Sequence, residues 1–229
     1  MSIFENAVDP GIGAVTAQGR VRVRDMARGD LRQVARLHRQ HFPDGYYARL
    51  GERFLVAHYR GFLESPHAVA FVVDHDEEVQ AFLVGTVDEV GHRRYLAQHR
   101  QLQLVTAGTV ALGARPALWW DFVRVRSHWY ARRALSRFRE GTSTGLDHGT
   151  FGELAYVITR PPARNRGIGA HLVESYLAAT RTSGASHAFL VTRAGNTVAR
   201  PFYEKRGWMA DGQRRTRDGA ALAAYRFGL

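Results

Sequence analysis

The sequence predicts an α/β protein, in which strands and helices alternate along the chain. Short apolar and β-branched runs are typical of strands, and they occupy residues 21–24, 69–73, 79–87, 153–159, 188–191 and 221–227. Apolar residues with helical spacing occur between these runs, at 31–37, 52–63 and 172–177, and in a short helix near 198–205. A strand, a glycine-bearing loop and a helix follow directly on one another between Glu153 and Leu177.

The length of the chain is sufficient for one well-packed domain that carries an insertion. Residues 1–19 are interrupted by Pro10 and three glycines and show no sustained periodicity, so we expect a flexible N-terminal arm. Residues 20–229 are expected to form a single domain. Helical patterns replace strand patterns between residues 92 and 141, and we expect this segment to be a helical insertion.

Composition excludes several classes of protein. No apolar run approaches the roughly 20 residues that a membrane-spanning helix needs, and the N-terminus lacks the pattern of a secretory signal. The chain contains no cysteine, which excludes disulfides and cysteine-ligated metals. Because no His, Asp and Glu residues have the spacing of metal ligands, we expect no metal cofactor. These features fit a cytoplasmic location.

The chain is strongly basic, with a formal net charge of +11. Lys205 is its only lysine, so 31 of the 32 basic residues are arginines. A basic surface suits a nucleic acid, but it also concentrates an anionic cofactor around a cleft. A nucleic-acid partner is therefore kept open without being favoured.

The segment Arg164–Gly169 lies between the predicted strand 153–159 and the helix that follows it. Backbone N–H groups at a helix N-terminus are free to bind a phosphate, and the two glycines of the segment let the backbone approach it. Arg164 and Arg166 can add charge-assisted hydrogen bonds. A Rossmann loop would have a third glycine and a Walker loop would have Gly-Lys-Ser/Thr, and neither is present. Taken alone, the two glycines also fit a tight turn without a ligand.

Three linked features resemble the GNAT superfamily of N-acetyltransferases over roughly residues 150–210. The first is an Arg/Gln-x-x-Gly-x-Gly/Ala signature, which is met by Arg164, Gly167 and Gly169. The second is the pattern Asn-x-x-Ala-x-x-Phe-Tyr-Glu-Lys-x-Gly-aromatic, which is met by Asn196, Ala199, Phe202, Tyr203, Glu204, Lys205, Gly207 and Trp208. The third is their spacing, with one helix and one strand between them.

The resemblance implies a mixed, mostly antiparallel central sheet flanked by helices, with the insertion between the third and fourth strands. It implies acetyl-CoA as co-substrate, with the pantetheine arm paired to the backbone of Val157, Ile158 and Thr159. A backbone N–H of this strand would stabilise the oxyanion. The pyrophosphate would lie on the residues Arg164, Asn165, Arg166, Gly167, Ile168, Gly169 and Ala170. Asn196 would contact the pantetheine, cap the following helix, or do both.

Two side chains are expected to carry the proton transfers of an amine acetylation. Tyr203 matches the tyrosine that, in many relatives, protonates the departing CoA thiolate; core packing is the alternative. Glu153 lies eleven positions before Arg164, where several branches of the family have a base. Partial burial would raise the pKa of this carboxyl, which could then accept the proton directly or through water; an exposed glutamate at a strand start is the alternative. His148 is a second candidate base.

The insertion at residues 92–141 departs from the family pattern, because most relatives have a short turn there. It holds ten arginines against two acidic residues, together with four Trp and Tyr side chains between Trp119 and Tyr130. This composition fits a helical pair packed on the sheet, a lid over the acceptor, a dimer surface, a lipid-contacting surface or an RNA-facing patch.

The sequence therefore predicts an N-acetyltransferase that moves an acetyl group from acetyl-CoA to a primary amine while both are bound. A small molecule is the expected acceptor. A tRNA- or protein-directed acetyltransferase, and an RNA-binding module that uses the arginines of the insertion, are the alternatives. A homodimer also stays open.

Overall fold

The computed structural model describes residues 14–16, 19–100, 150–215 and 219–229. Its main sheet is built from the strands β3 (Val23–Asp25), β4 (Ala68–His75), β5 (Glu78–Thr86), β6 (Phe151–Thr159), β7 (His187–Arg193), β8 (Met209–Arg215) and β9 (Ala221–Gly228). Over the described residues their order is β3-β4-β5-β6-β7-β9-β8. Neighbouring strands are antiparallel except β6 and β7, which are parallel. The prediction of a mixed, mostly antiparallel sheet is thus confirmed.

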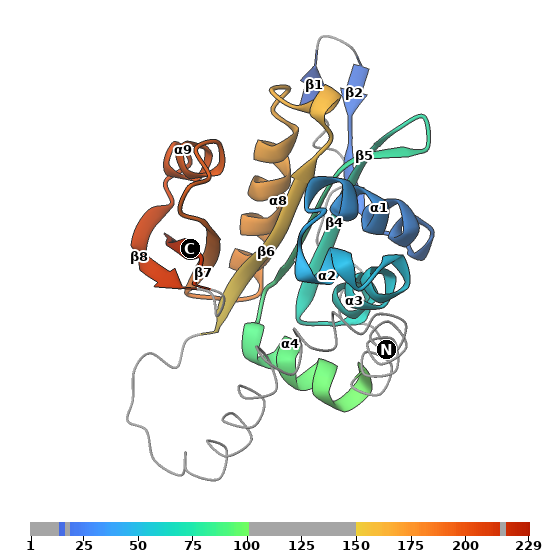
Figure 1. The fold of residues 1–229 in the computed structure, drawn as a ribbon. Coiled ribbons are helices and arrows are strands. Elements are labelled where there is room, and N and C mark those ends of the chain that lie inside the picture. The colour runs from blue at the N-terminus through green and yellow to red at the C-terminus, as the bar shows by residue number, and fades with distance from the viewer. Residues whose placement is uncertain (1–13, 17–18, 101–149, 216–218) are drawn as a thin grey trace.

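The helices lie on both faces of this sheet. Among the described residues they are α1 (Leu31–His41), α2 (Tyr46–Arg49), α3 (Glu52–Glu64), α4 (Glu89–Tyr95), α8 (Ile168–Thr182) and α9 (Ala199–Glu204), with short 3₁₀ turns at Arg28–Asp30 and Pro161–Ala163 and a π-helical turn at Leu96–Arg100. Figure 1 shows α1 and α3 on one face and α8 on the other.

The core consists of two apolar clusters, one on each face of the sheet. Leu83, Leu154, Leu172 and Tyr176 belong to the cluster beneath α8. The other cluster joins α1 and α3 to alternate residues of β4, β5 and β6, including Ile158. Because successive side chains of a strand point to opposite faces, the same three strands supply both clusters.

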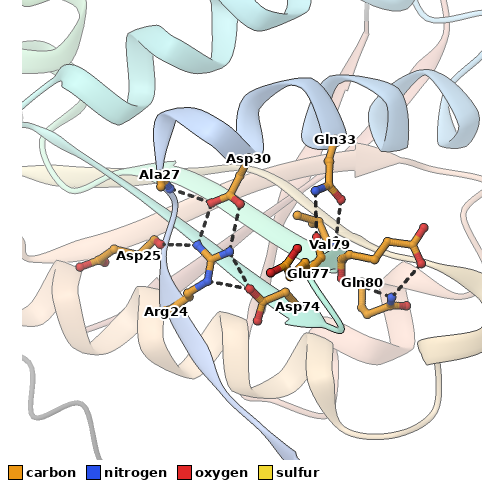
Figure 2. Close-up of polar contacts among 10 residues, drawn as sticks. Arg24, Asp25, Ala27, Asp30, Gln33, Asp74, Glu77, Val79 and Gln80 are labelled. Atoms are coloured by element: carbon orange, nitrogen blue, oxygen red, sulfur yellow. Dashed lines mark hydrogen bonds and ion pairs between the residues drawn. The ribbon is translucent and has the colours of Figure 1, made fainter.

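A polar network ties the short strand β3 to the rest of the sheet (Figure 2). The Arg24 guanidinium donates to both carboxylate oxygens of Asp30, at 2.7 and 3.0 Å, and to Asp74 at 2.6 and 2.8 Å. Gln33 of α1 accepts from the Val79 N–H at 2.9 Å and donates to the Glu77 carbonyl at 3.0 Å. These contacts hold α1 against the β4–β5 hairpin.

The N-terminal region differs in detail from its prediction. Ala14–Thr16 (β1) pairs with Gly19–Val21 (β2) as a two-stranded hairpin, inside the segment expected to be an irregular arm. The predicted strand at 21–24 is divided at Arg22, because β3 starts at Val23 and pairs with β4 instead. Hairpin pairing of so short a segment leaves little periodicity to detect.

The insertion follows the third strand of the main sheet, as predicted, because β5 is followed by α4 and the next strand is β6. Helical structure begins at Glu89, three residues before the predicted start at His92. The rest of the predicted insertion, from residue 101 onward, lies outside the described residues together with most of its arginines.

Candidate active site

The parallel strands β6 and β7 separate shortly after they begin. They pair only at Phe151–Glu153 with His187–Phe189, and from Leu190 onward β7 pairs with β9 alone. Within the described part of the chain, no strand pairs with this edge of β6 beyond Glu153. The backbone groups of the second half of β6, including Val157, are therefore available to an extended ligand on that side.

A β-bulge at Ala155 determines which β6 side chains face each side of the sheet. Val84 lies opposite Tyr156, whereas Gly85 lies opposite Leu154, so β6 has one extra residue at this step. Leu154 packs in the α8 cluster, whereas Tyr156 packs with the α1 and α3 cluster. Strand alternation directs Glu153 away from the Leu154 face, toward the side of Tyr156.

The loop after β6 leads into the N-terminus of α8 with free backbone donors. The backbone N–H groups of residues 165–169 have no hydrogen-bond partner among the residues that the structure describes, and the first partnered one is that of Ala170, which donates to Gly167 O. Gly167 has a φ of +78° and Asn165 a φ of +60°, which turns the chain sharply before the helix. Free donors at a helix N-terminus attract an anion.

The two arginines of this loop have different surroundings. Arg164 donates to the Thr159 carbonyl at 3.2 Å and lies 3.3 Å from His41 Nδ1, so it joins the loop to β6 and to the end of α1. Arg166 is exposed, and no described residue forms an ion pair or hydrogen bond with it. Its guanidinium is therefore free to bind an anion at the loop.

Three predicted segments converge at Gly169. A Cβ at this position would lie 3.6 Å from the Phe202 ring of α9 and 3.7 Å from Thr159 Oγ1 at the end of β6. The neighbouring Ile168 is buried in the α8 cluster. The end of β6, the start of α8 and the helix α9 therefore lie side by side, although about forty residues separate them along the chain.

Tyr203 lies on α9, between the rings of Phe202, Trp208 and Tyr225, at centroid distances of 5.1, 5.8 and 6.3 Å. Only 6% of its surface is exposed. Burial raises the pKa of the phenol above its ordinary value, while the nearby Arg206 opposes the rise. The group is therefore a neutral proton donor throughout the physiological range.

Asn196 lies in the turn before α9. Its Oδ1 accepts from the N–H groups of Val198 and Ala199, at 3.2 and 2.9 Å, and its Nδ2 donates to Thr192 Oγ1 at 3.4 Å. The side chain thus stabilises the turn that leads into α9, whereas the N-cap position itself is occupied by Val198.

Glu153 lies on β6 at the last residue that pairs with β7, and it is half-buried. Burial raises the pKa of its carboxyl to about 7, and the negative Glu89 adds to the rise. Arg93 and Arg214 oppose it through their positive charges. A carboxyl with such a pKa can accept a proton near neutral pH.

Glu89, which Thr86 joins to the Glu153 backbone N–H, was not anticipated from the sequence. It lies in the first turn of α4, where Asp88 accepts from the Gly91 N–H at 2.9 Å as the N-cap. The Asp88-Glu89 pair directly after a strand is a helix-start signal, but its contact with β6 depends on the fold. The candidate base His148 lies outside the described residues.

Two kinds of feature are absent from the described residues. No group of three or more His, Asp and Glu side chains in them could hold a metal ion. No helix in the same part of the chain is long and apolar enough to cross a membrane.

Residues 31–208 match the model of the acetyltransferase (GNAT) family, which is well over half of the chain. The chain belongs to the GNAT family. It is an acetyl-CoA-dependent N-acetyltransferase, as the resemblance implied, and its separated β6 and β7 and glycine loop lie within the matched residues.

Solved GNAT structures share the fold at low sequence identity. An N-acetyltransferase from Staphylococcus aureus Mu50 is 13% identical, with a TM-score of 0.56, over 91% of this chain and 98% of that one. Arabidopsis thaliana NAA60 in complex with acetyl-CoA is 12% identical, with a TM-score of 0.56 and the same coverages. The NatC complex bound to Gag peptide and CoA is 12% identical, with a TM-score of 0.52 and again the same coverages. No curated protein matches the sequence significantly.

Proposed function

We propose that this GNAT enzyme acetylates the primary amine of a small molecule by direct attack on acetyl-CoA while both are bound. The observation that carries the proposal is Glu153, a half-buried carboxyl with a pKa of about 7 at the point where β6 leaves β7. Holding both reactants in one site removes the entropic cost of a bimolecular encounter.

The residues of the loop and of β6 fit acetyl-CoA, which supplies the acetyl group as an activated thioester. The unpartnered N–H groups of residues 165–169 would bind the pyrophosphate, together with the free guanidinium of Arg166. Arg164 would act mainly by holding the loop on Thr159. The open edge at Val157 and Ile158 would pair with the amides of the pantetheine arm.

Glu153 would accept the proton that the amine loses, either directly or through water. Its raised pKa makes it a stronger base than an exposed glutamate, and it is ionised above about pH 7. Tyr203 would donate a proton to the leaving thiolate, because burial keeps its phenol protonated. The two groups would thus move protons in opposite directions. To complete the cycle, Glu153 would release its proton to solvent and Tyr203 would take up a proton from solvent.

The acceptor is proposed from the side chains that surround Tyr156 on the Glu153 face. The rings of His38, Tyr59 and His58 lie 5.1, 6.0 and 6.1 Å from the Tyr156 ring, and Phe42, at 6.5 Å, is 39% exposed. Tyr59 and His38 are buried in this cluster, so the exposed Phe42 and the partly buried Tyr156 are the rings that an amine on a small apolar or aromatic group would contact.

A peptide acceptor is the second candidate, because the NatC complex has the same fold and is bound to a peptide. A tRNA-linked amine is the third, on account of the net charge of +11.

An acceptor panel separates these alternatives. It contains phenethylamine, an alkyl amine, a free-N-terminus peptide, a lysine peptide and aminoacyl-tRNA, and thiol release from acetyl-CoA measures each reaction.

We expect phenethylamine to react fastest. Glu153→Gln should lower kcat/KM for this amine by about 10²–10⁴-fold at pH 8. In the wild type, kcat/KM should rise as the pH increases through about 7, because Glu153 is active when deprotonated. Binding of CoA to the variant, measured by calorimetry, should be unchanged. Turnover of a peptide or aminoacyl-tRNA alone would overturn the small-molecule assignment, and full activity of Glu153→Gln would overturn its role as base.

A further inference from the structure

The first turn of α4 carries a buried carboxylate into the active site. Strand β5 ends at Thr86. Two positions later, Asp88 accepts a hydrogen bond from the Gly91 N–H as the N-cap of α4. This short connection leaves the side chain of Glu89 only 7% exposed. Burying a carboxylate costs several kcal/mol of folding free energy unless hydrogen bonds and a countercharge satisfy it. The partners of Glu89 therefore indicate what its carboxylate does.

Glu89 is joined to the backbone of Glu153 through Thr86. The Thr86 hydroxyl donates to Glu89 Oε2 at 3.0 Å and accepts from the Glu153 N–H at 2.9 Å. Arg93, one turn further along α4, donates from Nε to Glu89 Oε1. Thr86 and Glu153 are also direct neighbours in the β5–β6 ladder. The position of Glu89 relative to β6 is therefore set by side-chain and main-chain contacts together.

Thr86 thus joins the Glu89 carboxylate to the Glu153 backbone, and the negative charge of Glu89 acts on the Glu153 carboxyl. A hydrogen bond between the two carboxyls forms only when one of them holds a proton, because two carboxylates are acceptors only. Burial and the charge of Glu89 both raise the pKa of Glu153. The other charged or titratable groups that interact electrostatically with it are Arg93 of α4, Arg214 of β8 and, across the sheet, Tyr176 of α8.

We propose that Glu89 is a positioning residue for the reaction: its carboxylate, held by Thr86 and Arg93, orients the Glu153 carboxyl and shares one proton with it. The proposal rests on the assignment of Glu153 as base. When the amine transfers its proton to a Glu153 oxygen, the new O–H donates to Glu89, and no charge is left unpaired beside Arg93. The first turn of the insertion is then part of the catalytic apparatus.

Two variants with opposite expected shifts test this proposal. Glu89→Gln removes the negative charge and leaves Arg93 facing Glu153, so the acid limb of the kcat/KM profile should move about 1–3 pH units lower. Arg93→Gln removes a positive charge that lowers the pKa of Glu153, so the acid limb should move to higher pH. Arg93 is more than half exposed, so its replacement should not prevent folding.

The matched control is Glu52→Gln, in the first turn of α3, whose ion pair with Arg36 is long and exposed at 3.4 Å. Its pH profile should match that of the wild type. Two outcomes would overturn the positioning role. In the first, Glu89→Gln loses activity at every pH while its acid limb stays in place. In the second, the acid limb moves in neither test variant.

A readout without turnover separates this proposal from the proposed function. Titration of ¹³C-carboxyl-labelled glutamate by NMR, with the Glu153 signal assigned from Glu153→Gln, should show its pKa fall in Glu89→Gln. If that shift occurs but Glu153→Gln keeps full activity, the shared proton stands and the assignment of Glu153 as base fails. If the signal does not move, the shared proton itself is disproved.

Discussion

At the scale of single residues, Tyr203 and Tyr225 are two buried tyrosines in contact that have different partners. Tyr225 donates to Glu204 Oε1 at 2.7 Å and accepts from Arg200 Nε at 3.2 Å, so its hydroxyl is engaged within the protein. Tyr203 is surrounded by rings and lies beside the Phe202 that contacts the start of α8. A neutral phenol with no role in a structural network suits a proton donor.

Tyr203→Phe should lower kcat by about 10²-fold or more, because the thiolate would then leave without a general acid. CoA affinity should be unchanged, since the ring remains. The comparison is Tyr225→Phe, which removes the hydroxyl of the second buried tyrosine and should cost about 1 kcal/mol of stability but leave kcat unaltered. Equal kcat values in the wild type and Tyr203→Phe would show that the tyrosine only packs the core.

At the scale of elements, α8 lies closely on β5 and β6 because two glycines face it. A Cβ on Gly152 would lie 2.6 Å from Tyr176 Oη and 2.6 Å from the Thr86 carbonyl, and one on Gly85 would lie 2.5 Å from the Tyr176 ring. Tyr176 Oη donates to the Thr86 carbonyl at 3.1 Å across this contact. The glycines therefore let a helix pack against the strands just before Glu153.

Gly152→Ala should destabilise the protein by about 1–3 kcal/mol, since the added methyl forces backbone and Tyr176 apart. Thermal unfolding measures the loss as a lower Tm. Gly195→Ala serves as the comparison, because a Cβ there meets nothing within 4 Å, and its effect should stay within about 0.5 kcal/mol. A Gly152→Ala protein as stable as the wild type would mean that α8 can move outward freely.

At the scale of the whole molecule, three buried histidines join helices on one face of the sheet. Burial lowers the pKa of His58 to about 3, and those of His38 and His92 to about 4. His58 Nε2 and His92 Nδ1 are buried without a partner among the described residues. His38 Nδ1 lies 2.5 Å from the Tyr59 hydroxyl.

These histidines are neutral in the fold but bind protons more readily when unfolded. The stability they contribute is therefore complete above pH 6.5 and decreases as the pH falls toward 4 and 3. Replacing His58 with Phe, which keeps the stacking on Tyr47 and Phe54, should reduce the loss of Tm between pH 7 and pH 4.5. The control is His171→Gln, at a partly exposed site, which should leave this loss of Tm as it is in the wild type. An unchanged pH dependence of Tm in His58→Phe would refute this account.

Much of the fold was predictable because its signals are local. The predicted helices at 31–37 and 52–63 correspond to α1 and α3, and the strand–loop–helix unit corresponds to β6, the glycine loop and α8. The edge strand β8 was missed, since each of its residues is exposed and no apolar alternation marks it. The four-residue α2 was also missed, because one helical turn is too short for a periodic pattern.

The sequence by itself determined the donor half of the chemistry. The family signature, the free N–H groups and the position of Glu153 eleven residues before Arg164 all follow from short-range order along one strand, loop and helix. Local spacing is sufficient there, because a strand and a helix place consecutive residues at known positions.

Only the tertiary structure decided what surrounds Glu153. Glu89 is 64 residues away along the chain, and its place beside Glu153 depends on the β5–β6 pairing, on Thr86, which joins its carboxylate to the Glu153 N–H, and on the bulge at Ala155. Likewise, the point at which β6 separates from β7, after Glu153, is visible only in the pairing of strands that lie far apart in the chain. The charge that one carboxyl feels from another depends on distance and burial, and neither is encoded in local sequence pattern.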